Sequence, residues 1–163
     1  MEFVIKTVPI LLSLVGVSIS VYTLLSTRRD LKKSAERQFL ETSSTTCHHI
    51  LADLNMHAAT GRLLPREFIG FVDSEAFNQL ISHKQAALRF QHAVWYEDFD
   101  GMLTVMGKIG ATSGRIARQM RERNLDVAER EMVDVPLGTA VVEAANAVAK
   151  YINTARDRLT ALG

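Results

Sequence analysis

The sequence predicts an all-α protein with one N-terminal transmembrane helix and a cytosolic bundle of about four main helices. Two observations predict this class. Residues 7–27 carry no charged side chain, and apolar residues in 28–163 recur at helical intervals of three and four. Alternating β-strand patterns are absent from residues 28–163. We therefore expect a membrane segment at 1–27 and a helical domain at 28–163.

The charge balance limits the partners of this chain. Its 163 residues include 19 basic and 18 acidic side chains, which gives a net charge of +1. A uniformly basic surface for coating nucleic acid is not supported, so we expect no double-stranded nucleic acid partner. The single cysteine, Cys47, excludes an internal disulfide framework and fits a reducing compartment.

The uncharged segment has the length of a membrane span. As a helix, residues 7–27 rise about 30 Å, roughly the thickness of the hydrocarbon core. A cleavable signal peptide would place basic residues before a shorter apolar run, whereas here RRDLKK follows at 28–33. The positive-inside rule then orients the chain with its N-terminus outside and residues 28–163 in the cytoplasm. We expect a single-pass protein of the inner (cytoplasmic) membrane.

Small and hydroxyl-bearing residues follow one face of the expected span. Ser13, Gly16, Ser20 and Thr23 are spaced by three and four. Lipid gives helices no hydrophobic reason to associate, and such residues usually mark a helix–helix contact. The pattern predicts self-association into a homo-oligomer. Two alternatives remain open: the hydroxyls bond back to their own helix, or they line a pore.

The first half of the domain reads as three helical segments. Residues 28–59 contain no proline or glycine, so a helix continuous with the span, or bent from it, is expected to end at Gly61. PREFIGFV at 65–72 follows as a short element with proline in its first turn. Asp73 and Ser74 are suitable caps for the next helix, which we expect to continue as far as Trp95.

The second half is expected to hold two long helices. DFDG at 98–101 is predicted to break the chain before a helix from Met102 to about Arg123. RNLD turns that helix, and VAEREMV forms a short piece before Pro136. The last helix, about 137–162, has the most regular apolar period, at Val141, Ala145, Val148, Ile152, Ala155, Leu159 and Leu162. This seam is suited to packing within the bundle or across subunits.

Enzyme motifs are missing from the sequence. There is no phosphate-binding GxxxxGK[ST], no GxSxG, no HExxH and no paired CxxC, so we expect neither a catalytic residue nor a cofactor. His49, Asp53 and His57 recur every four residues and could offer ligands to a transition metal. A second helix would have to complete that site, and we expect a polar helix face without metal.

The segment GKIGATSGRIARQMRER at 107–123 is the best candidate for an anion site. Its candidate ligand-binding residues are Gly110, Ser113, Gly114, Arg115, Arg118 and Arg121. Arginine offers planar donors suited to phosphate or carboxylate, and glycine allows close approach to the backbone. GATSGR could cradle an anion as a loop. The segment is more coherent as a helix, where the alternative is tight packing with solvated or paired arginines.

The aromatic stretch RFQHAVWYEDF carries Phe90, Trp95, Tyr96 and Phe99. Such residues stack on nucleic acid bases in some proteins. At helical spacing they belong more often to a core, which is the interpretation we favour.

In outline the chain resembles the small membrane-anchored effectors of type III CRISPR defence that respond to cyclic oligoadenylate. The features that match are the span VPILLSLVGVSISVYTLL, the collar RRDLKK and a compact helical remainder with an arginine-bearing segment. The resemblance implies an oligomeric effector that binds a cyclic nucleotide and acts on the membrane. Many such effectors use a Rossmann-like sensor, and this chain has no βαβ pattern. A structural or adaptor subunit of a membrane complex, and a metal-dependent enzyme, are the competing hypotheses.

Overall fold

The computed structural model is all-helical, as the sequence predicts. It describes the backbone of residues 2–60, 65–122 and 136–163, and the side chains of residues 16–56, 69–118, 121–122 and 138–163. No strand occurs within these ranges. The expected turn at RNLD, the short piece VAEREMV and the helix-ending Gly61 lie outside the described residues.

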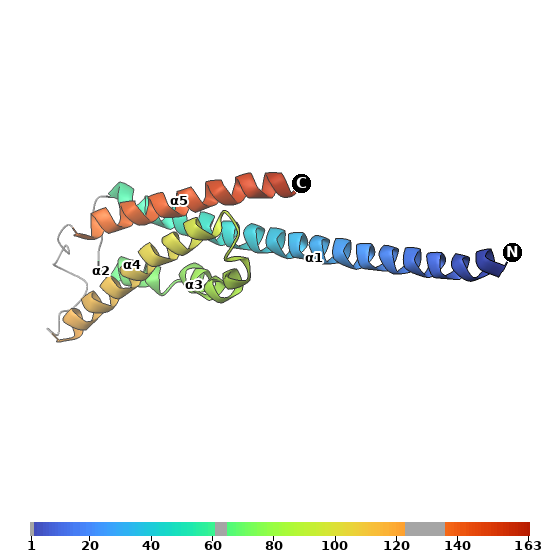
Figure 1. The fold of residues 1–163 in the computed structure, drawn as a ribbon. Helices are drawn as coiled ribbons and strands as arrows, with labels where there is room; N and C mark the ends of the chain where they lie inside the picture. The colour runs from blue at the N-terminus through green and yellow to red at the C-terminus, as the bar shows by residue number, and fades with distance from the viewer. Residues whose placement is uncertain (1, 61–64, 123–135) are drawn as a thin grey trace. The chain divides into compact units, whose positions relative to one another are not determined.

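The chain divides into two compact units, residues 1–38 (unit 1) and residues 39–163 (unit 2). Helix α1 (Glu2–Thr60) contributes its first part to unit 1 and the rest to unit 2. Unit 2 continues with α2 (Pro65–Val72), α3 (Glu75–Ala87), the short 3₁₀ helix η1 (Leu88–Phe90), α4 (Tyr96–Glu122) and α5 (Pro136–Leu162) (Figure 1). The continuous helix expected through residues 28–59 is confirmed within α1.

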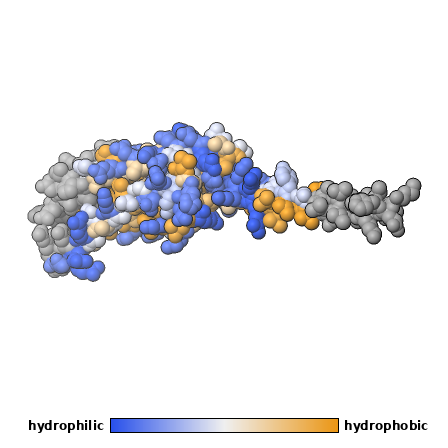
Figure 2. Space-filling view, in the orientation of Figure 1, coloured by the Kyte–Doolittle hydropathy of each residue, from blue (hydrophilic) through white to orange (hydrophobic). Residues whose placement is uncertain are grey.

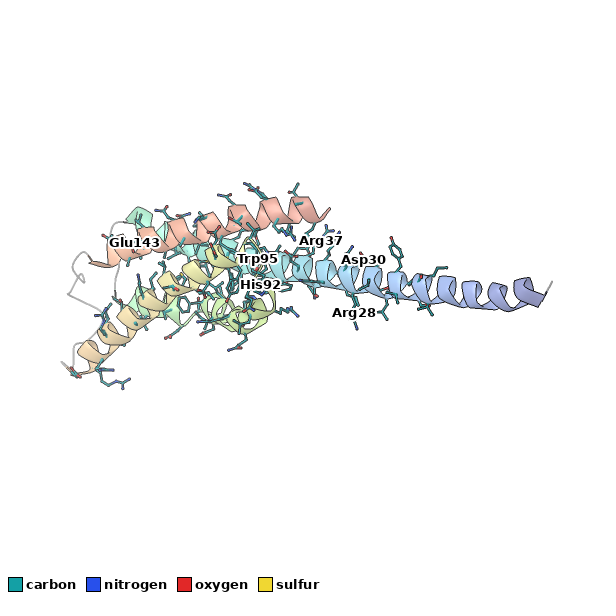
Figure 3. The ribbon with its side chains drawn as sticks, in the orientation of Figure 1. Arg28, Asp30, Arg37, His92, Trp95 and Glu143 are labelled. Carbon is teal, nitrogen blue, oxygen red and sulfur yellow. The ribbon has the colours of Figure 1, made fainter. Side chains whose placement is uncertain are left out.

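The core of unit 2 forms where α1, α4 and α5 present their apolar faces. In α1 the buried positions Phe39, Cys47, Ile50 and Leu54 recur at helical spacing. Trp95, just before α4, is fully buried and lies among the helices in Figure 3. The other large buried side chains include Phe99, Met102, Met106, Ile109, Val141 and Tyr151. Burying these apolar surfaces is the main force that holds the bundle together.

The seam of α5 packs inside the bundle. Val141, Val148, Ile152 and Ala155 are buried, and α4 is the principal neighbour of α5. The expected packing within the bundle is therefore confirmed for this part of the seam. Leu159 and Leu162, at the C-terminal end, are only half-buried.

The start of α3 is capped as the sequence predicts. The Ser74 side chain accepts a hydrogen bond from the backbone N–H of Phe77 at 3.3 Å. This contact satisfies one of the backbone donors that a helix N-terminus leaves free.

The expected continuation of this helix to Trp95 is wrong. α3 ends at Ala87, and η1 and a turn over residues 91–95 lead into α4. The rings of Phe90 and Trp95 both pack on Phe39, with centroids 5.6 and 5.1 Å from it. Residues five apart on one helix point about 140° away from each other. The break therefore allows both rings to reach the same partner.

The expected break at DFDG is also wrong, because these residues form the first turns of α4. Glu97 and Asp98 lie in the first helical turn, where the helix dipole favours negative charge. Asp98 also accepts a hydrogen bond from Thr154 Oγ1 at 2.7 Å and pairs with Lys150 Nζ at 2.8 Å. These contacts with α5 hold the segment in the helix and outweigh the turn tendency of Asp-Gly.

Within the part of the chain that the structure describes, no helix combines the length and the apolar character needed to cross a membrane. The expected span at residues 7–27 has described side chains only from Gly16 onward.

Candidate functional site

The arginine-bearing segment forms part of α4, which runs without interruption through GATSGR. The alternative in which GATSGR is an anion-cradling loop is therefore wrong. The apolar face expected for the helical form is present, since Met106, Ile109 and Ile116 are buried. The segment is thus an amphipathic helix with one face in the core.

The candidate anion-binding residues do not all lie on one surface. Arg118 and Arg121 are exposed and share a helix face with Gly110 and Gly114. Arg115 is also exposed, and its Nη2 donates to Thr112 Oγ1 at 3.1 Å. Ser113 is only 4% exposed and belongs to the buried side of α4. An anion on this face would therefore meet the arginines and the glycines but not the Ser113 hydroxyl.

The two glycines of this face have different surroundings. A Cβ atom at Gly110 would lie 3.7 Å from the Phe77 ring, which is ordinary contact, whereas a Cβ at Gly114 would meet nothing within 4 Å. An alanine would therefore fit at either position, although only Gly110 has a neighbour within the bundle. The surface beside Gly114 is open to an approaching ligand or to a second copy of the chain.

His49, Asp53 and His57, the possible metal ligands, all belong to α1. His49 is exposed and Asp53 is half-buried, while the side chain of His57 lies outside the described residues. Among the described side chains, no three His, Cys, Asp or Glu residues are grouped so that they could hold a metal ion.

Three of the four aromatic side chains of this stretch belong to the core, as we favoured, whereas Tyr96 is half-buried. Phe90, Trp95 and Phe99 are at most 5% exposed, so these rings are not available for stacking on bases. Arg89 lies over the Phe90 ring, with its Cζ 4.9 Å from the ring centroid. This cation–π contact covers the edge of the aromatic cluster.

The single cysteine, Cys47, is buried and unreactive. Burial raises the pKa of the Cys47 thiol to about 12, and its Sγ donates to Met102 Sδ at 3.6 Å. A thiol that stays protonated is a poor nucleophile and a poor metal ligand.

Sequence reasoning missed the polar contacts between distant helices. Ser43 of α1 and Tyr151 of α5 are both buried, and their side-chain oxygens lie 2.6 Å apart.

His83 of α3 packs edge-on to the Phe39 ring at 5.9 Å between centroids. Its buried Nε2 has no hydrogen-bond partner among the described residues. No spacing in the sequence links residues that are this far apart along the chain.

The described part of unit 1 presents a largely apolar exterior on α1. Its exposed large apolar side chains are Val17, Ile19, Val21, Tyr22, Leu24, Leu25 and Leu31. Figure 2 shows hydrophobic side chains beside the grey N-terminal residues and hydrophilic ones further along the helix. The basic residues Arg28, Arg29, Lys32 and Lys33 are exposed as well.

The hydroxyl stripe of α1 bonds back to its own helix. Ser20 Oγ donates to the Gly16 carbonyl at 2.9 Å, and Thr23 Oγ1 donates to the Ile19 carbonyl at 2.9 Å. Such bonds hide the hydroxyl proton from an apolar surrounding. The oxygens can still accept a bond from a neighbour, so self-association of the stripe stays a prediction. Ser13 lies outside the described side chains.

No protein-family model, no curated protein and no solved structure matched the chain.

Proposed function

We propose that this chain is a homo-oligomeric, single-pass membrane effector. Its cytosolic domain binds an anionic ligand, and binding changes the arrangement of the spans so that they perturb the membrane. The observation that carries the proposal is the uncharged stretch at 7–27, directly followed by RRDLKK. Antiviral defence through a cyclic oligonucleotide messenger is the setting that the overall plan suggests.

The exterior of α1 supports the membrane part of the proposal. Val17, Ile19 and Tyr22 are each more than half exposed, and further exposed apolar side chains follow as far as Leu25. Contiguous apolar surface of this kind is unfavourable in water and typical of segments covered by lipid or protein. The cations that follow agree with a cytoplasmic boundary at about residue 28.

The arginine face of α4 supports the ligand part. Arg118 and Arg121 approach an anion from one side only, so an enclosed site requires a second copy of the helix. Two copies related by a symmetry axis would offer the same arginines to a symmetric cyclic ligand. Such a ligand shifts the oligomer only as far as it binds one arrangement better than the other.

A structural or adaptor subunit is the alternative. Its supports are the long helix seams, which could bind a foreign protein, and the hydroxyl stripe of α1, which could pack on foreign spans. Because Val141, Val148 and Ile152 pack inside unit 2, that part of the seam needs no external partner. The α5 seam therefore lends the adaptor no support, and the hydroxyl stripe is compatible with either hypothesis.

Dye-filled vesicles carrying the full-length chain provide the test. We expect one of the cyclic tri-, tetra- or hexa-adenylates to bind the protein and to release the dye. The double variant R118A/R121A should lose both effects. The matched control K84A/R156A removes two exposed cations from α3 and α5 and should keep them. A chain that neither binds any of these nucleotides nor changes dye release with them would refute the effector proposal.

A further inference from the structure

Two shallow grooves run along α1 within unit 1. One is lined by Ile19, Ser20, Thr23, Leu24, Thr27 and Arg28, and the other by Tyr22, Leu25, Ser26, Arg29, Asp30 and Lys33. At about 100° per residue, their centres lie on different faces of the helix. Figure 3 shows the Arg28 and Asp30 side chains extending from different sides of α1. The two grooves can therefore face different neighbours at the same time.

The first groove carries the hydroxyl stripe. Ser20, Thr23 and Thr27 line it, and each donates its proton to a carbonyl one turn earlier, at 2.8–2.9 Å. Hydroxyl groups whose protons are already bonded, set between the apolar side chains of Ile19 and Leu24, are suited to contact with another helix. It ends in a single cation, Arg28.

The residues along the second groove complement the successive parts of an anionic phospholipid, from its acyl chain to its phosphate. Tyr22 and Leu25 form an apolar, aromatic end, the Ser26 hydroxyl follows, and Arg29 and Lys33 form the charged end. Tyrosine prefers the membrane–water boundary, where its ring is apolar and its hydroxyl is wet. Arg29 and Lys33 are four residues apart, so both can reach one phosphate from the same face.

We propose that this second groove binds the headgroup of an anionic phospholipid, with Arg29 and Lys33 on the phosphate and Tyr22 beside the upper acyl chain. The proposal rests on the membrane span proposed above and adds a division of labour. The hydroxyl face meets another copy of the helix, and the Tyr22 face meets lipid. Charge complementarity selects the occupant, because two cations and one carboxylate leave this groove net positive.

Asp30 lies at the edge of the second groove and opposes an anion there. One carboxylate beside two cations weakens the attraction of the groove for phosphate without reversing it. Replacing Asp30 with asparagine should therefore tighten lipid binding, a change that a purely structural role for this residue would not produce.

The test counts lipid molecules on the purified full-length chain in neutral detergent. Phosphatidylglycerol is titrated in, and the bound lipid is measured by native mass spectrometry, with phosphatidylcholine as the neutral reference. We expect R29Q/K33Q to weaken phosphatidylglycerol binding by about tenfold to thirtyfold, the combined effect of two cations near an anionic headgroup. The matched control R28Q/K32Q removes the same charge from the same collar on another face. It should stay within about threefold of wild type, because Arg28 and Lys32 do not line the second groove.

Each outcome decides the proposal. Selective loss in R29Q/K33Q, with tighter binding in D30N, supports it. Equal losses in both double variants reduce the effect to general charge, and failure of wild type to prefer phosphatidylglycerol removes the site; either result overturns the proposal. Failure of the span itself is seen separately, because the chain would then leave phosphatidylcholine vesicles in an alkaline wash. Unchanged helical circular dichroism confirms that the variants are folded.

Discussion

At the scale of single residues, the buried pair Ser43 and Tyr151 fixes how α1 and α5 meet in unit 2. Ser43 Oγ donates its only proton to the Phe39 carbonyl at 2.8 Å. The Tyr151 hydroxyl must then be the donor in the 2.6 Å contact between the two side chains. Burial raises the pKa of Tyr151 above its ordinary value, which keeps that proton in place.

The direction of these two hydrogen bonds predicts that substitutions at Ser43 and Tyr151 lower stability by different amounts. S43A leaves the buried Tyr151 hydroxyl without an acceptor and should lower the free energy of unfolding by about 1–3 kcal/mol. Y151F leaves Ser43 bonded to Phe39 and should cost about 1 kcal/mol. The double variant S43A/Y151F should be no less stable than S43A alone. Urea unfolding of the full-length chain measures all three, and additive losses would contradict the assignment of the proton.

The free energy of unfolding depends on pH through His83. Desolvation lowers its pKa below the usual 6.5, so the folded state prefers the neutral ring, as expected beside Phe39 with a buried, unpartnered Nε2. The unfolded chain then binds the proton more tightly. The stability gained from a neutral His83 is complete above pH 6.5 and declines as the pH falls toward the folded pKa.

Melting temperatures between pH 7.5 and pH 5 test this dependence. H83F keeps an aromatic ring and removes the titrating nitrogen, so its melting temperature should fall less over this range than that of wild type. H92Q, at an exposed histidine, serves as the control and should follow wild type. If H83F and wild type lose stability in parallel, His83 is not the group responsible.

At the scale of helices, α4 shows what local sequence could and could not predict. Its apolar face and its helical path through the glycines follow from spacing alone. Its start does not, because the break at 91–95 and the helical DFDG depend on Phe39 and on the α5 residues Lys150 and Thr154. Contacts between residues this distant in sequence have no local signal.

The link between Asp98 and α5 predicts a second acid effect. Hydrogen bonds from Lys150 and Thr154 lower the pKa of Asp98 in the folded state. The charged carboxylate therefore contributes to the stability of the fold above pH 3.8, and this contribution is lost as the pH falls through the lower, folded pKa. Lys150 is 72% exposed, which keeps the pair weak. D98N should lower the melting temperature by about 2–4 °C at pH 7. The gap between D98N and wild type should close as the pH falls below 3.8 and through the folded pKa, and a gap that does not narrow would contradict the role of the charge.

Replacing Gly114 of α4 with alanine tests whether this position needs a glycine for an interaction. An alanine at Gly114 meets open space, so G114A should stabilise the helix by about 0.5–1 kcal/mol. If this face receives a ligand or a second helix, the same substitution should weaken oligomerisation or nucleotide binding. Analytical ultracentrifugation with and without cyclic oligoadenylate, alongside thermal unfolding, measures both effects. A more stable protein with unchanged assembly and binding would show that Gly114 has no interaction role.

At the scale of the whole molecule, the sequence predicts the helical class and most of the core. Regular apolar spacing identifies the buried faces of α4 and α5, and the proline and serine signals place the starts of α2 and α3. The candidate sites are harder to predict. Helical spacing groups Arg118 with Gly114 and already puts Ser113 between Ile109 and Ile116, but it does not show which exposed face of the helix a ligand would meet.

The central claim is that residues 7–27 hold the chain in a membrane. Its most direct measurement is alkaline carbonate extraction of membranes from cells expressing the full-length chain, followed by protease treatment of intact inside-out vesicles. We predict that the wild-type chain stays in the pellet and that protease on the cytoplasmic side removes the domain beginning near Arg28. A variant with lysine at Gly16 and Leu24 should be released, because charge at the centre of a span is costly. Release of the wild-type chain into the carbonate supernatant would contradict the account.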